Sequence, residues 1–154
     1  MQTTQTRQTD RSRETVAQLN SLLRGEISAA ETYKMAIDRA AAEFPAQVRS
    51  LRAIAQEHGE GAQLLRECVK RQGGEADDSS GAWGIYAKTI EGVAKIFGDT
   101  TALKALKEGE EHGLRDYRDA LDSLDGESRR LVAEQLIPAQ ERHITTLDGM
   151  IATL

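Results

Sequence analysis

Four ionisable residues occupy positions where a helical protein needs apolar side chains. Each falls on the apolar face of a separate stretch with helical periodicity, and they are Glu26, His58, Glu110 and His143. A charge inside a helical bundle is costly unless it is paired or bound to a metal ion. Two carboxylates and two imidazoles in one bundle interior therefore indicate a candidate metal site.

The predicted ligands are oxygen and nitrogen atoms, which favour iron, manganese or zinc. Glu57 directly precedes His58, so its carboxylate is expected to reach the same point as a further ligand. Gln140 lies one helical turn before His143, where its amide can hold a ligand by hydrogen bonding. The predicted metal-ligating residues are Glu26, Glu57, His58, Glu110 and His143. No catalytic residue and no organic cofactor are assigned.

The first two helices have clear limits in the sequence. The first is predicted to begin after Ser12, an acceptable N-cap, and to end near Ala42. Pro45 disfavours helical geometry at the preceding residue and fits the first turn of a second helix. The second helix is predicted to stop at Gly73-Gly74, because glycine accepts the left-handed conformation that ends many helices.

The rest of the chain predicts one short aromatic helix and two longer ones. After the polar connection 75–81, bulky residues at helical spacing predict a helix that plugs the bundle; they are Trp83, Tyr86, Ile90, Val93 and Phe97. The third long helix follows Thr100, and the fourth follows the tight turn at 125–128. Pro138 is expected to kink the fourth helix, because proline removes one backbone donor.

Spacing from the turns tests whether the four residues lie at one depth. In an antiparallel hairpin, residues equidistant from the turn lie at the same height. Glu110 and His143 are centred on the turn 125–128, so they are expected to face each other. Glu26 and His58 are centred on Ala42, slightly before the expected turn, which predicts an axial offset of up to about 9 Å. Helix slippage or an asymmetric loop can absorb much of this offset.

A second interpretation needs no metal. The same acids and imidazoles can form a buried polar network that fixes the register of the helices. His143 and Gln140 can pair with Tyr33 or Tyr117 in such a network. His112 lies off the apolar face and is predicted to be exposed. The sequence alone leaves both interpretations open.

Composition limits the class of protein. Of 154 residues, 29% are charged and 4% are aromatic, which favours helices over strands. A net charge of −5 argues against nucleic-acid and anionic-membrane partners. Cys68 is the single cysteine and cannot form an internal disulfide, which favours a reducing compartment. With no apolar run long enough to span a membrane, we expect a cytoplasmic protein that forms a dimer or larger homo-oligomer.

The N-terminal segment differs from the rest. Residues 1–12 contain no apolar residue after Met1, which predicts a disordered tail. Residues 13–154 are predicted to form one domain.

Three motifs resemble the ferritin-like superfamily. The stretch 19–33, with Leu19-Asn20, Glu26 and Tyr33, resembles the first helix of bacterioferritins, in which the glutamate binds metal. Gly109-Glu110, with a downstream tyrosine, is similar to the third helix of rubrerythrins. The stretch 140–143 occupies the place of the Glu-x-x-His motif on the fourth helix.

The resemblance also shows what is missing. Gln140 replaces the expected glutamate, and the pair Glu57-His58 does not form Glu-x-x-His, so a complete diiron ferroxidase set is absent. The layout is most similar to an uncharacterised family of small, stand-alone bacterial ferritin-like proteins, with a Gly-Gly pair after the second helix and an aromatic segment containing Trp83. This resemblance implies an all-α, ferritin-like antiparallel four-helix bundle with an extra helix in the second-to-third connection. It implies metal binding and stress association, whereas the alternative is a non-enzymatic structural or interaction bundle.

Overall fold

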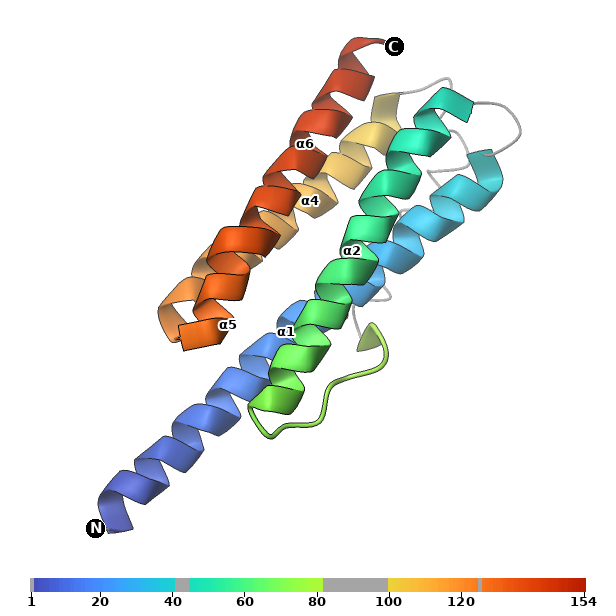
Figure 1. Cartoon of the computed structure of the whole chain (residues 1–154). Coiled ribbons are helices and arrows are strands. Elements are labelled where there is room, and N and C mark those ends of the chain that lie inside the picture. Colours follow the sequence, from blue (N-terminus) through green and yellow to red (C-terminus); the bar gives the residue numbers. More distant parts are fainter. Residues whose placement is uncertain (1, 41–44, 82–99, 125) are drawn as a thin grey trace.

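The computed structural model describes residues 2–40, 45–81, 100–124 and 126–154. Within these ranges four long helices lie side by side (Figure 1): α1 (Gln2–Ala40), α2 (Pro45–Arg71), α4 (Thr100–Ala120) and α6 (Ile137–Ala152). The predicted all-α class is confirmed for these ranges, whereas the aromatic helix predicted over 83–97 lies outside them. None of the helices described is both long and apolar enough to cross a membrane.

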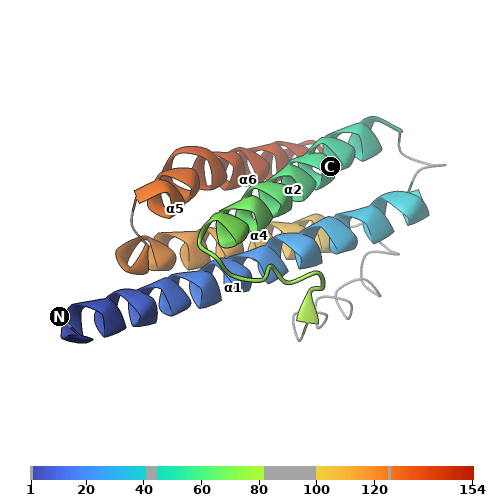
Figure 2. The ribbon, with the colours of Figure 1, turned by 60° about the horizontal axis from the view of Figure 1, so that its bottom comes forward.

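The helices form two hairpins. α2 runs back along α1, and α6 runs back along α4 (Figures 1 and 2). These two pairs pack most extensively, while α1 also contacts α4 and α2 also contacts α6. The four helices thus surround one shared interior, with looser packing between the hairpins than within them.

The apolar core consists of two clusters with a polar layer between them. Each long helix contributes to the first cluster, through residues such as Ile37, Leu51, Leu103 and Leu147. The second cluster includes Leu23, Leu65, Tyr117 and Val132. Along α1, α2 and α4 the polar residues stand between the residues of these clusters, so apolar side chains close the polar layer from both ends.

α1 begins earlier than the sequence predicted. Residues 2–12 are helical and do not form the disordered tail that their composition predicts. The segment contains no proline and no glycine, which are the residues that most strongly oppose a helix. Thr9 Oγ1 donates to the carbonyl oxygen of Gln5 at 2.9 Å. The side chains of residues 3–11 are exposed, so this extension adds nothing to the core.

The predicted end of α2 is confirmed. Gly73 has φ +78°, the left-handed conformation that glycine adopts without a steric cost. Its N–H donates to the carbonyl oxygen of Lys70 at 2.9 Å, and the N–H of Gly74 donates to that of Val69 at 3.0 Å. This is the hydrogen-bond pattern of a Schellman C-cap.

The connection after this cap lies along α1. Asn20 Nδ2 donates to the carbonyl oxygen of Glu75 at 2.8 Å, and Asn20 Oδ1 accepts from the N–H of Asp77 at 2.9 Å. Arg24 pairs with the Asp77 carboxylate. One amide side chain and one ion pair therefore hold the predicted loop against α1.

Substituting Gly74 tests the packing of this cap against α1. A Cβ atom at position 74 would lie 2.5 Å from Val16 Cγ1. We expect Gly74→Ala to lower the free energy of unfolding by about 1–3 kcal/mol, because Val16 is stiff at χ1 and cannot easily move away. Urea unfolding measures the effect. Val16→Ala in the same chain should recover much of the loss, and fully additive costs would contradict the predicted contact.

The last helical region is interrupted before Pro138. It consists of α5 (Gly126–Leu131), a π-helical turn (Val132–Leu136) and α6, with a 3₁₀ turn (Leu121–Ser123) preceding the sharp turn at Gly126. The N–H of Ile137 donates to the carbonyl oxygen of Val132, one residue further back than in an α-helix. The π-turn accommodates a proline that lacks an N–H and whose ring would crowd the preceding turn. The sequence predicted a kink here but not its π-helical form.

Candidate metal centre

The four ionisable residues that the sequence placed on apolar faces are buried. His58 and Glu110 are each 2% exposed, Glu26 is 6% exposed and His143 is 4% exposed. Gln140 is buried beside them, whereas His112 is not, as predicted. Each long helix therefore contributes at least one side chain to the polar layer.

His58 stands between two carboxylates. Its Nδ1 lies 2.6 Å from Glu26 Oε2, and its Nε2 lies 2.9 Å from Glu110 Oε1. Both ring nitrogens face acceptors, so the imidazolium form satisfies both contacts by donating from each nitrogen. The axial offset predicted between Glu26 and His58 does not keep them apart, because their side chains meet directly.

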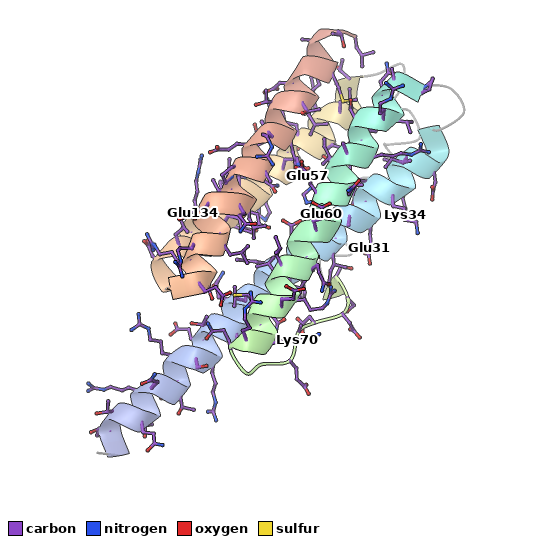
Figure 3. All side chains as sticks on the ribbon, in the orientation of Figure 1. Glu31, Lys34, Glu57, Glu60, Lys70 and Glu134 are labelled. Carbon is purple, nitrogen blue, oxygen red and sulfur yellow. The ribbon has the colours of Figure 1, made fainter. Side chains whose placement is uncertain are left out.

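His143 continues the same chain of contacts. Its Nδ1 lies 3.3 Å from Glu110 Oε2, and its Nε2 lies 2.7 Å from Glu57 Oε2. Glu57, labelled on α2 in Figure 3, has a side chain that is 39% exposed, and it also accepts from Arg142 at 3.4 Å. Carboxylates and imidazoles therefore alternate across the protein from buried Glu26 to half-exposed Glu57.

Two tyrosines bind the acids from the opposite hairpin. Tyr33 on α1 donates to Glu110 Oε1 at 2.6 Å, and Tyr117 on α4 donates to Glu26. Each tyrosine follows the glutamate of its own helix by seven residues. Because α1 and α4 run in opposite directions (Figure 1), the two identical spacings let each tyrosine reach the other helix's glutamate.

Gln140 fixes the remaining oxygen of Glu110. Its Nε2 donates to Glu110 Oε2 at 2.5 Å and to the Glu110 carbonyl oxygen at 3.1 Å. Gly113 leaves room for this amide, because a Cβ at that position would lie 2.8 Å from Gln140 Nε2. Among the described residues, every buried side-chain nitrogen and oxygen atom has a hydrogen-bond partner.

The charged groups of the polar layer shift one another's pKa values. Burial alone lowers the pKa of His58, but attraction to Glu26 and Glu110 outweighs it and raises the pKa to about 10. Burial alone raises the pKa of Glu110, but the two histidines lower it to about 2. Burial and the neighbouring carboxylates raise the pKa of both Tyr33 and Tyr117. At neutral pH the tyrosines remain hydrogen-bond donors and His58 carries a proton.

Three of these groups have the spacing of a metal site. One ligand atom each from His58, Glu110 and His143 lies within 4.8 Å of the other two. Ligands held at about 2.0–2.2 Å from one ion lie at most about 4.4 Å apart. At tetrahedral angles such ligands lie about 3.3–3.6 Å apart, so the widest pair must close by up to about 1.5 Å for all three to bind a single ion.

Glu26 and Glu57 contact the two imidazoles on the side away from Glu110. Each bonds to the histidine nitrogen that points away from Glu110. Metal-binding histidines commonly donate their second N–H to a carboxylate, which fixes the ring orientation. The sequence predicted both glutamates as ligands. Its metal-free interpretation paired His143 and Gln140 with Tyr33 or Tyr117, whereas the tyrosines bind Glu110 and Glu26 instead. The repeated seven-residue spacing between glutamate and tyrosine was the available signal.

The fold and the layer define an all-α protein with a buried carboxylate–imidazole cluster. The chain belongs to the family described as "Domain of unknown function (DUF2383)", whose sequence model matches residues 14–123. The matched range contains Glu26, Glu57, His58 and Glu110, whereas His143 lies beyond it. No curated protein and no solved structure gives a significant match.

Proposed function

We propose that the protein is a ferritin-like metal-binding bundle that holds one divalent ion per chain. The ligands in this proposal are His58 Nε2, the Glu110 carboxylate and His143 Nδ1. The convergence of these three groups within 4.8 Å carries the proposal. Glu26 and Glu57 orient the imidazoles through their outer nitrogens.

The order and direction of the helices support the ferritin-like assignment. α2 and α4 run in the same direction (Figure 1), so the second helix of the first hairpin is parallel to the first helix of the second hairpin. One long crossover between two antiparallel hairpins distinguishes ferritin-like bundles from simple up-and-down bundles.

The ligand set favours iron, manganese or zinc. Three protein ligands leave coordination positions open, so bound iron or manganese would supply redox or Lewis-acid chemistry and zinc only Lewis-acid chemistry. A ligand imidazole must be neutral, so His58 gives up its proton when an ion binds. Glu26 then accepts the remaining N–H of His58 and keeps the ring in place.

A purely structural role is the competing proposal, and one observation favours it. The buried polar atoms of the described residues are already satisfied by protein groups. A complete network of this kind can set the register of four helices without an ion. The two proposals differ in whether the protein retains stoichiometric metal.

Elemental analysis of variants separates the two proposals. The protein is purified without chelator, loaded separately with Mn²⁺, Fe²⁺ or Zn²⁺, and passed through a desalting column. We expect one ion per chain in the wild type and loss of that ion in Glu110→Gln and His143→Gln, because each removes one of three ligands. Circular dichroism confirms that each variant is folded.

Glu111→Gln is the matched control. Glu111 is adjacent in sequence, but its side chain is 42% exposed and pairs with Lys107 at 3.7 Å. This variant should keep the ion. A wild type that retains no metal after loading with all three ions, or ligand variants that keep it, would refute the metal site; metal-free wild type would favour the structural role.

A further inference from the structure

A groove of about 260 Å³ lies between α1 and α4, at the loosely packed contact of the two hairpins. Its inner end reaches Tyr33, His58 and Glu110 in the polar layer. Asp116 and Asp119 line it further along α4, and both side chains are accessible there. The groove therefore joins the surface of α4 to the buried layer.

The acidic side chains of the groove outnumber its basic ones. Its described lining contains the carboxylates of Glu26, Glu110, Asp116 and Asp119, but no lysine or arginine. Two histidines also line the groove: His58 lies between Glu26 and Glu110 at the inner end, and His112 pairs with Asp116 at 3.4 Å. A negatively charged groove with low-dielectric walls attracts cations and repels anions.

The walls between the acidic ends are apolar or small. Leu22, Gly25 and Ala29 line the groove from α1, and Gly113 lines it from α4. Among the described residues, a Cβ atom at Gly25 would have no neighbour within 4 Å, so none of their side chains fills the groove at this point. This middle section can accept an alkyl chain but offers an inorganic ion few ligands.

The spacing of the carboxylates along α4 sets the length of a ligand that contacts Glu110 and Asp116 together. Glu110 and Asp116 are six residues apart on α4, which corresponds to about 9 Å along the helix. A volume of 260 Å³ is near the small end of ligand pockets, which measure roughly 300–1,000 Å³. Both measures fit a chain of about four to six carbons with an amine at each end.

We propose that the groove between α1 and α4 binds a short linear diamine, with one ammonium near Asp116 and Asp119 and the other near Glu26 and Glu110. Its alkyl chain lies against Leu22, Gly25 and Ala29. This binding site does not require a metal ion, and the proposal goes beyond the metal-binding function.

Isothermal titration calorimetry of the chelator-treated full chain tests the proposal. The probes are 1,5-diaminopentane, 1-aminopentane and 1,5-pentanediol, which share a chain length but differ in the number of charged ends. We expect the diamine to bind at least tenfold more tightly than the monoamine and the diol not to bind. No diamine binding, or equal binding of diamine and diol, would overturn the proposal.

Two variants locate the binding site. Gly25→Leu fills the open middle of the groove, and its matched control is Gly59→Leu, an exposed glycine of α2 that also has no atom within 4 Å. We expect Gly25→Leu to weaken diamine binding at least tenfold and Gly59→Leu to leave it unchanged. Equal diamine affinity in both variants would refute the groove as the site.

The double variant Asp116→Asn/Asp119→Asn provides a second test that does not disturb the interior. It should weaken the diamine at least tenfold and bring it close to the monoamine; an unchanged affinity overturns the assignment even if Gly25→Leu fails to fold. None of these variants changes a proposed metal ligand, so metal content is measured in parallel. Diamine binding without metal would refute only the metal site, and metal without diamine binding would refute only the groove.

Discussion

Replacing Glu110 with leucine is expected to lower the free energy of unfolding of the chelator-treated protein by about 3–5 kcal/mol. Glu110 accepts hydrogen bonds from Tyr33 and Gln140 and contacts both buried histidines. Its loss leaves the positive charge of His58 with Glu26 alone. Removing one partner of a buried ion pair costs far more than the pair itself contributes, because the remaining charge stays desolvated.

Urea unfolding in the presence of chelator measures this loss. Glu111→Leu is the control, because it makes the same chemical change one residue further on, at a half-exposed ion pair with Lys107. Such surface pairs contribute about 0–1 kcal/mol, so the control should stay close to the wild type. Similar losses in the two variants would show that the Glu110 contacts do not stabilise the fold.

A fall in stability between pH 7 and pH 9 is the second large effect expected, again in chelator. The pKa of His58 rises from 6.5 to about 10 on folding, because Glu26 and Glu110 hold its proton against the cost of burial. The stability from this proton is complete below pH 6.5 and is lost as the pH rises toward 10. One such proton corresponds to about 2–3 kcal/mol between pH 7 and pH 9. The pKa of Glu110, at about 2, lies far below this window.

Urea unfolding at pH 7, 8 and 9 measures the fall. His58→Gln removes the imidazole and leaves every other side chain of the protein unchanged, so the comparison isolates the His58 proton. The variant should lose much less stability over this range than the wild type. Glu26→Gln, which keeps His58 but removes one of its two carboxylates, should give an intermediate slope. An equal fall in the wild type and His58→Gln would contradict the role of this proton.

The sequence predicted the depth of the polar layer well, because depth depends on helix geometry and turn position. Glu110 and His143 are equidistant from the 125–128 turn, and their side chains meet at 3.3 Å. For Glu26 and His58 the same argument predicted an offset, yet their atoms meet at 2.6 Å. Side-chain reach is comparable to that offset, so backbone spacing alone cannot determine contact.

The partners of each polar group could not be predicted in the same way. Whether His58 presents Nδ1 or Nε2 to Glu110 depends on its rotamer and on carboxylates from other helices. The same holds for Glu57, which bonds to the outer nitrogen of His143. These choices arise from tertiary contacts. As a result, Glu26 and Glu57 position the histidines in the proposed site and are not themselves ligands.

Local composition did not predict the start of α1, and it predicted the irregularity in the last helical region only in part. The polar residues 2–12 contain no helix breaker, so α1 continues through them although they bury nothing. Pro138 correctly indicated an irregularity in the last helix. The π-turn before it depends on backbone hydrogen bonds that are not encoded in a residue pattern.

Anomalous X-ray diffraction from crystals of the zinc-loaded protein, collected on both sides of the zinc absorption edge, would test the metal site most directly. We predict one anomalous peak per chain, about 2.0–2.2 Å from His58 Nε2, His143 Nδ1 and a Glu110 carboxylate oxygen. A peak only at other residues, or an intact Glu26–His58–Glu110 hydrogen-bonded layer with no peak despite zinc in the crystal, would contradict the proposed centre.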